Sequence, residues 1–404
     1  MNQASRPTEP ISQQTSRPYD ELVHDLEGRA RAQLDLIWNV TPVCPWNCAG
    51  CCVAALHVKQ KHGAVLVSAS DLSSYQPISD AGGGSLYDKA SRHLQRQGIE
   101  LTLASKLQVL ENVRGHDVRL DVSGGDVLSV TENLIVLQAA SSQLGRENVT
   151  LTATGVGLVR QDVEELASLV GEMNFTFDGE PDAEGPLRPS TYAMGNLRKA
   201  KQFAAAGVST RAECPLSAQN LEPEALARIY LELHEGGIDK LLLMRHFPVG
   251  RGQLIPEVIP SNDQYRRAIS ILRELEARYG SPTVKLQCAL RLLEGPSAKN
   301  PCDALTVSFG LLWDGTLLGS PWAINKAGRP IDEAWVLGNL ATTPLGIILQ
   351  SEKTVRLRAR ASENHGQCKI FSWLNGTSPS SEDRIFEHTD PMYAPPQSTF
   401  DGAA

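Results

Sequence analysis

Three cysteines lie close together near the start of the chain, at a spacing that suits metal binding. Cys44, Cys48 and Cys51 form a C-x3-C-x2-C pattern. A loop this short can bring three thiolates to one side, and Pro45 and Gly50 help it to turn tightly. Three thiolates at this spacing suit a cubane iron–sulfur cluster and leave one iron without a protein ligand. That open iron would be a binding position for a substrate.

The same thiols have two other interpretations, a zinc site and a chance grouping. A closed zinc site usually needs two paired ligand motifs, and the sequence has no second C-x2-C. Cys52 follows Cys51 directly, and adjacent cysteines rarely bind one ion together. A secreted disulfide framework would spread its cysteines through a short chain. The pattern therefore favours an iron–sulfur cluster over zinc.

The composition narrows the class of protein. The chain has 404 residues, with 38 Lys and Arg against 46 Asp and Glu, which gives a formal net charge of −8. This mild acidity argues against a protein whose main task is to bind the phosphate backbone of a nucleic acid. The sequence has neither an apolar run of about 18 residues nor an apolar signal segment at its N-terminus. We therefore expect a cytoplasmic protein with no nucleic-acid or membrane partner.

Short apolar runs of strand type alternate with amphipathic helical segments after the cysteine motif. This alternation predicts parallel strands joined by right-handed crossovers. The expected fold is α/β, a partial (β/α)6 TIM-like barrel with a small α+β C-terminal module, and a doubly wound sheet is the alternative. The six expected strands are 35–41, 117–125, 149–155, 173–179, 207–214 and 239–245.

The pattern also suggests where the chain divides. We expect flexible tails at 1–33 and 375–404, because both are rich in polar residues and proline. The barrel is expected at 34–285, and 57–100 is long enough to be an insertion that forms a lid. A strand hairpin around Asp314 and Gly315 places a second, smaller domain at 286–374.

The cysteine motif, placed after the first strand, resembles that of the radical S-adenosylmethionine (radical SAM) superfamily. The resemblance extends over about residues 35–255 and implies a [4Fe–4S] cluster on the three motif cysteines, with S-adenosylmethionine (SAM) on the open iron. Each further motif falls where an expected strand ends. The cofactor-binding residues implied by the resemblance are Gly124, Gly125, Asp126, Thr154, Thr176, Arg211 and Glu213.

The C-terminal module resembles a SPASM or twitch domain, which in many relatives carries auxiliary iron–sulfur clusters. Cys302 and the Leu337–Leu340 run match that pattern, but Ser320 stands where a second cysteine is expected. Serine is a poor substitute for thiolate on iron. We therefore expect a degenerate module without its cluster. A three-cysteine auxiliary cluster that includes Cys288 and Cys368 is the alternative.

The resemblance implies an enzyme that cleaves SAM reductively to a 5′-deoxyadenosyl radical, which then abstracts hydrogen from its substrate. A peptide is the expected substrate, as in the maturation of ribosomal peptides, and a specialised small molecule is the alternative. The competing class is a non-enzymatic iron–sulfur or redox-sensing protein. Asp178 and Cys214 are the candidate catalytic residues. A flavodoxin or ferredoxin is the expected electron donor.

Overall fold

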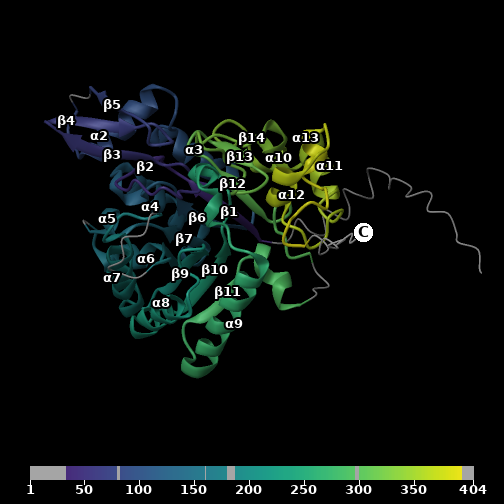
Figure 1. The fold of residues 1–404 in the computed structure, drawn as a ribbon. Helices are drawn as coiled ribbons and strands as arrows, with labels where there is room; N and C mark the ends of the chain where they lie inside the picture. Colours follow the sequence, from purple (N-terminus) through teal and green to yellow (C-terminus); the bar gives the residue numbers. More distant parts are fainter. Residues whose placement is uncertain (1–32, 80–81, 160, 180–186, 296–299, 394–404) are drawn as a thin grey trace, which may run out of the picture. The chain divides into compact units, whose positions relative to one another are not determined.

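A ten-stranded sheet forms the centre of the chain in a computed structural model that describes residues 33–79, 82–159, 161–179, 187–295 and 300–393. The strand order is β11-β10-β9-β8-β7-β6-β1-β12-β13-β14, and the sheet does not close (Figure 1). All neighbours from β11 to β12 are parallel. The strands are β1 (Leu34–Asn39), β6 (Val118–Ser123), β7 (Val149–Thr152), β8 (Glu172–Thr176), β9 (Ser209–Leu216), β10 (Lys240–Arg245), β11 (Thr283–Leu286), β12 (Ser308–Leu311), β13 (Thr316–Leu318) and β14 (Val336–Asn339).

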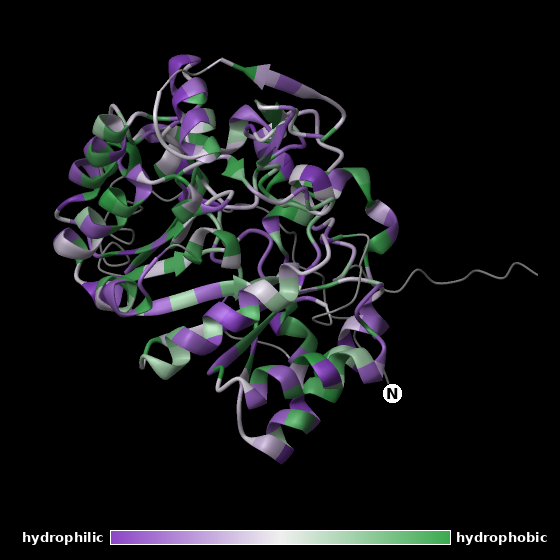
Figure 2. Cartoon of the chain, turned by 90° about the vertical axis from the view of Figure 1, so that its left-hand side faces the viewer, coloured by the Kyte–Doolittle hydropathy of each residue, from purple (hydrophilic) through white to green (hydrophobic). Residues whose placement is uncertain are grey.

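The α/β partial barrel expected from the sequence is confirmed. All six expected strands are present, and β11 and β12 extend the parallel part of the sheet. Helices connect the strands, and Figure 2 shows hydrophobic and hydrophilic residues mixed along the helices of the chain. These helices are α3 (Leu103–Val113), α4 (Glu132–Leu144), α5 (Gly155–Leu158), α6 (Val163–Leu169), α7 (Tyr192–Ala205), α8 (Pro223–Glu235) and α9 (Asn262–Tyr279). No helix within the described ranges is long and apolar enough to cross a membrane.

The segment that interrupts the first β/α unit forms a small sheet of its own. It contains β2 (Val43–Cys44), β3 (Leu56–Lys61), β4 (Ala64–Ser68) and β5 (Tyr75–Ile78), followed by helix α2 (Leu86–Arg96). A separate hydrophobic cluster that includes Val58, Val67 and Leu94 holds these elements together. None of the described residues of 57–100 lines the main cavity. A lid function for this segment stays a prediction.

The C-terminal module continues the main sheet rather than forming a second one. Strand β12 pairs in parallel with β1, and β12, β13 and β14 form an antiparallel extension, which includes the predicted hairpin. Short helices follow, on the opposite side of Figure 1 from β3–β5. They are α10 (Leu345–Leu349), α11 (Glu352–Ala359), α12 (Lys369–Asn375) and α13 (Ser381–Arg384). The division into domains at residue 286 stays a prediction.

The expected C-terminal tail needs a correction over 375–393. Ile385 and Phe386 are buried, and the Asn364 Nδ2 donates to the Ile385 carbonyl at 3.0 Å. The Asp390 carboxylate forms a buried ion pair with Arg245 at the end of β10, at 2.8 Å. These contacts anchor the segment to the module and to the sheet. Residues 394–404, and residues 1–32 of the expected N-terminal tail, lie outside the described residues.

Candidate active site

A cavity of about 190 Å³ lies at the carboxyl ends of the parallel strands. Parallel α/β folds collect their functional sites at this edge of the sheet. The loop after β1, the ends of β6 to β10 and the module all contribute to its wall. The sequence-predicted residues that line it are Cys44, Cys48, Cys51, Gly124, Gly125, Thr154, Thr176, Asp178 and Glu213. The structure therefore brings most of the predicted site together.

The three motif cysteines border this cavity as free thiols. Cys44 and Cys48 are buried, and Cys51 is partly exposed. Burial raises the pKa of the Cys44 thiol well above its usual range, and the nearby Cys48, Asp126 and Cys51 raise it further. Three thiolates at this place therefore need a positively charged partner to be stable. Within the described residues, no three His, Cys, Asp or Glu side chains are arranged to hold a single metal ion.

The Arg251 side chain binds the backbone of the cysteine loop. It is almost fully buried, at 1 % exposure. Its Nε donates to the Cys48 carbonyl at 2.9 Å, and its Nη1 donates to the carbonyls of Ala55 at 2.6 Å and Ser70 at 2.8 Å. Its backbone N–H donates to the Cys51 carbonyl at 2.9 Å. One side chain therefore fixes the loop and ties it to the small sheet.

The glycine pair after β6 lets two backbone segments meet. The Gly125 N–H donates to the Thr41 carbonyl at 2.8 Å. A Cβ at Gly124, which has a φ of +141°, would lie 2.6 Å from the Thr41 oxygen, and one at Gly125 would lie 2.3 Å from the Val43 oxygen. A side chain at either position would push the turn away from the start of the cysteine loop. The pair therefore positions the cysteine loop as well as lining the cavity.

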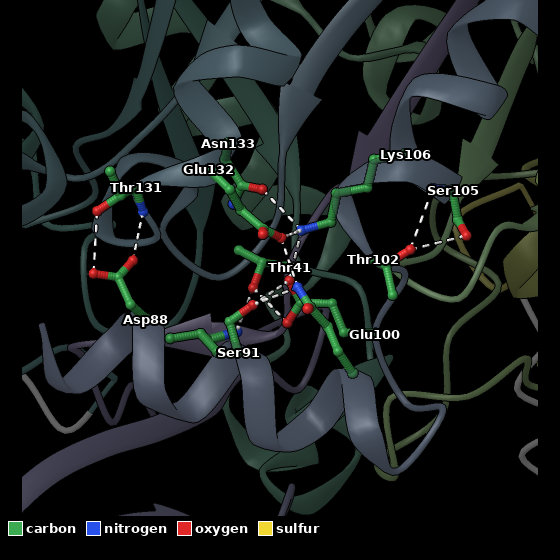
Figure 3. Close-up of polar contacts among 12 residues, drawn as sticks. Thr41, Asp88, Ser91, Glu100, Thr102, Ser105, Lys106, Thr131, Glu132 and Asn133 are labelled. Atoms are coloured by element: carbon green, nitrogen blue, oxygen red, sulfur yellow. Dashed lines mark hydrogen bonds and ion pairs between the residues drawn. The ribbon is translucent and has the colours of Figure 1, made fainter. Parts of the chain in front are cut away.

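A buried polar network supports the same loop from the other side (Figure 3). The Thr41 hydroxyl donates to Glu100 Oε2 at 3.1 Å, and the Ser91 hydroxyl donates to Glu100 Oε1 at 2.9 Å. The Lys106 ammonium lies 2.7 Å from Glu100 Oε1 and 3.0 Å from Glu132 Oε1. Because the side chains of Lys106 and Glu100 are fully buried, each charge depends on the other.

Asp126 differs from the sequence-based expectation of cofactor contact, because it does not line the cavity. Its Oδ2 instead accepts hydrogen bonds from the hydroxyls of Ser129 at 2.9 Å and Thr154 at 2.7 Å, and from the Gly157 N–H at 2.8 Å. Trp46 Nε1 then donates to Thr154 Oγ1 at 3.1 Å. Asp126 therefore fixes Thr154 at the cavity wall, which in turn holds an indole beside the cysteine loop.

The two predicted residues on β9, Arg211 and Glu213, differ in their position relative to the cavity. Glu213 lines the cavity, whereas Arg211 does not and pairs with Glu172 at 3.0 Å and Glu213 at 3.4 Å. The sequence did not single out Asp121, which also lines the cavity. Burial and the neighbouring Glu213 charge raise the pKa of Asp121 to about 7. The cavity therefore holds two carboxyl groups, one from β6 and one from β9, close enough for their charges to interact.

The two candidate catalytic residues also have different surroundings. Asp178 lines the cavity and accepts hydrogen bonds from Arg188, whose Nε lies 2.9 Å from Asp178 Oδ2. Cys214 is fully buried outside the cavity wall, and burial raises the pKa of its thiol. It therefore has no route to a ligand in the cavity, and the sequence-based proposal of a catalytic Cys214 is not supported by its position.

Sequence reasoning missed several residues in the cavity wall. Arg188 stacks on the Tyr192 ring, at 5.3 Å from its centroid, and Tyr192 meets Trp46 edge to face. His246 is buried at 5 % exposure, and its Nε2 has no hydrogen-bond partner in the described part of the chain. Burial and the Arg188 charge lower the pKa of His246 to about 4. Only the position of His246, directly after β10, could have indicated it from sequence.

The module contributes an aromatic side chain and holds the other cysteines. Trp322 lines the cavity and stacks on Phe247, with ring centroids 4.8 Å apart. Cys288, Cys302 and Cys368 lie near enough to influence one another, because Cys302 and Cys368 both raise the pKa of the half-buried Cys288 thiol. The hydroxyl of the buried Ser320 accepts a hydrogen bond from the Trp322 N–H at 3.3 Å. The loss of an auxiliary cluster stays a prediction.

Comparison with solved structures finds the same fold in two radical SAM enzymes. SuiB from Streptococcus suis, bound to its precursor peptide SuiA, aligns with a TM-score of 0.61 at 13% identity, over 95% of this chain and 84% of SuiB. The enzyme anSMEcpe, with AdoMet (another abbreviation of SAM) and the Cp18Cys peptide bound, aligns with a TM-score of 0.54 at 14% identity, over 89% of this chain and 98% of anSMEcpe. No protein-family model matches the sequence, and no curated protein is significantly similar to it. The chain therefore has the radical SAM fold.

Proposed function

We propose that this chain is a radical SAM enzyme, with a [4Fe–4S] cluster on Cys44, Cys48 and Cys51 and with SAM in the adjoining cavity. The observation that carries the proposal is the position of the three thiols. They line one cavity at the carboxyl ends of the strands, in a fold shared with SuiB and anSMEcpe. Both of those enzymes have been solved with SAM bound.

The donor set fits an iron–sulfur cluster. Thiolates are the ligands that such clusters prefer, and the iron charge offsets the repulsion and burial that raise the pKa of Cys44. A bound and reduced cluster would supply the one electron that breaks the S–C5′ bond of SAM, which would give methionine and a 5′-deoxyadenosyl radical able to abstract hydrogen from the substrate. A reduced flavodoxin or ferredoxin would be a suitable donor of that electron.

The chain itself would bind SAM and exclude water. The Thr176 hydroxyl and the Glu213 carboxylate, at paired positions on β8 and β9, line the cavity and offer hydrogen bonds to the polar groups of SAM. The Thr154 oxygen, whose proton goes to Asp126, offers a further acceptor. Trp46 and Tyr192 pack against each other with ring centroids 5.3 Å apart. This aromatic pair would shield the reacting atoms from water, which protects a radical from side reactions.

We also propose a peptide as the substrate. Support comes from the two structural neighbours, which are solved with the SuiA precursor and the Cp18Cys peptide bound. In this chain Phe247, Trp322 and the neutral His246 form an aromatic part of the cavity wall, and we assign the substrate to it. Its mixture of flat aromatic surface and one unpartnered ring nitrogen suits a peptide side chain with a nearby amide.

The test of the activity is anaerobic reconstitution of the full chain with iron and sulfide, followed by dithionite and SAM. We expect 5′-deoxyadenosine and about four irons per chain, or about eight if the module holds a second cluster. A Cys48→Ala variant should form no product, and Cys214→Ala, outside the cavity, should retain it. A wild-type protein with an intact cluster and no product would refute the proposed activity.

The substrate class needs a separate test. Short peptides encoded beside the gene would be prepared with deuterated side chains and incubated with the reconstituted enzyme. Transfer of deuterium into 5′-deoxyadenosine would support a peptide substrate. Deuterium transfer from a small metabolite, and from none of these peptides, would contradict it while leaving the radical SAM activity intact.

A further inference from the structure

The segment that follows β8 returns to the cysteine loop. The Ala49 N–H donates to the Leu187 carbonyl at 3.1 Å. The Leu187 side chain packs on Gly50, where an added Cβ would lie 3.4 Å from Leu187 Cδ2. Both contacts involve residues between Cys48 and Cys51, so the backbone at Leu187 is fixed against the loop. The next residue, Arg188, therefore has a defined position beside the motif cysteines.

The Arg188 guanidinium lies between a carboxylate and a motif thiol. Its Nε and Nη2 both lie 2.9 Å from Asp178 Oδ2. Arg188 lines the same cavity as Cys48, and its positive charge favours the thiolate form of Cys48, which lowers the pKa of that thiol against the effect of burial. The side chain of Asp178 is only 6% exposed, and its backbone carbonyl accepts a hydrogen bond from Asn220 Nδ2 at 2.9 Å. The hydrogen bond from Asn220 thus fixes the backbone of Asp178, and the Asp178 carboxylate holds Arg188 near Cys48.

We propose that Arg188 and Asp178 together set the reduction potential of the cluster bound through Cys48. This inference rests on the proposed function, because it requires the cluster. A positive charge beside a cluster thiolate stabilises the reduced cluster, which carries one more electron, and so raises its potential. Asp178 opposes that effect, because its negative charge partly neutralises Arg188. Arg188 is therefore a positioning residue that acts through a cluster ligand.

The two residues should shift the potential in opposite directions. Replacing Arg188 with Gln removes the positive charge and should make the midpoint potential more negative. Replacing Asp178 with Asn leaves Arg188 uncompensated and should make it less negative. Arg188→Lys, which keeps the charge but loses the planar fork, should fall between the wild type and Arg188→Gln. A purely structural disturbance of the loop would not produce shifts of opposite sign.

The experiment is a potentiometric titration of the reconstituted full chain without SAM, in which the EPR signal of the reduced cluster is measured at each potential. Arg198→Gln is the matched control, because Arg198 is exposed on α7 and its loss changes the net charge equally. We expect the control to match the wild type and the Arg188 and Asp178 variants to shift as described. If Arg188→Gln fails to assemble a cluster, the Arg188→Lys and Asp178→Asn titrations decide the question.

Two outcomes would overturn different claims. If Arg188→Gln and Asp178→Asn retain the cluster and titrate with the wild-type midpoint, or shift in the same direction, the inference on Arg188 is wrong and the proposed function stands. If the wild-type chain assembles no cluster after reconstitution, the proposed function fails and this inference fails with it. Iron and sulfide analysis of each sample separates the two cases.

Discussion

Replacement of Lys106 by Met tests the buried network that supports the cysteine loop. The side chains of Lys106 and Glu100 are both fully buried, with the ammonium 2.7 Å from Glu100 Oε1. Lys106 also lies 2.9 Å from Asn133 Oδ1. Removing the cation leaves Glu100 buried with only the hydroxyls of Thr41 and Ser91 as donors. Breaking a buried pair in this way costs about 3–5 kcal/mol of unfolding free energy.

The size of this loss should depend on pH. Burial raises the pKa of Glu100 even with Lys106 present, so without Lys106 the folded state favours the protonated carboxyl more strongly. An acid whose pKa is higher in the folded state loses stability as pH rises from its unfolded pKa toward its folded pKa. The Lys106→Met variant should therefore be closer to the wild type at pH 5 than at pH 8.

Urea unfolding of the apoprotein at both pH values measures the effect. Arg114→Met is the matched control, because Arg114 pairs with Glu111 at 2.6 Å but both side chains are more than half exposed. An exposed pair contributes about 0–1 kcal/mol. A Lys106→Met loss below about 1 kcal/mol, or one that does not change between pH 5 and pH 8, would refute the reasoning.

Three further predictions concern the loop and the cavity floor. Gly125→Ala should prevent cluster assembly, measured as iron content, because its Cβ would lie 2.3 Å from a loop carbonyl. Gly195→Ala, where a Cβ meets nothing within 4 Å, is its control, and equal iron content in the two variants would contradict this view. Arg251→Met loses three hydrogen bonds to backbone carbonyls and should lower both iron content and the melting temperature. An unchanged melting temperature would show that the loop does not depend on Arg251. Because the pKa of Asp121 is raised to about 7, its ionisation should destabilise the fold by roughly 2–4 kcal/mol between pH 4 and pH 7. Asp121→Asn should flatten the pH dependence of urea unfolding over that interval, and an unchanged slope would contradict the assignment.

The sequence predicted the features that depend on local pattern. Strands such as 149–155 and 239–245 are apolar runs between amphipathic helices, and their order alone predicts parallel pairing. Since parallel strands end at the same edge of a sheet, the polar and glycine residues after them were expected to meet. Gly124, Thr154 and Thr176 do line one cavity with the cysteines.

The features that the sequence did not reveal depend on tertiary contacts. The position of Asp126 suggested a ligand contact, but its side-chain direction is set by Thr154 and Gly157, which come from the next unit. Arg188 lies in a stretch without periodicity, and a backbone contact to the cysteine loop brings it to the site. Phe386 follows a segment rich in Ser and Pro, and its burial depends on packing against the module.

The most direct test of the account is the EPR spectrum of the reduced, reconstituted protein, recorded with and without SAM. Cys44, Cys48 and Cys51 leave one iron of a [4Fe–4S] cluster open, so SAM should bind that iron and change the spectrum. A Cys52→Ala variant should retain this change, and a Cys48→Ala variant should lose it. A [4Fe–4S] signal that is identical with and without SAM, or that persists unchanged in Cys48→Ala, would contradict the central claim.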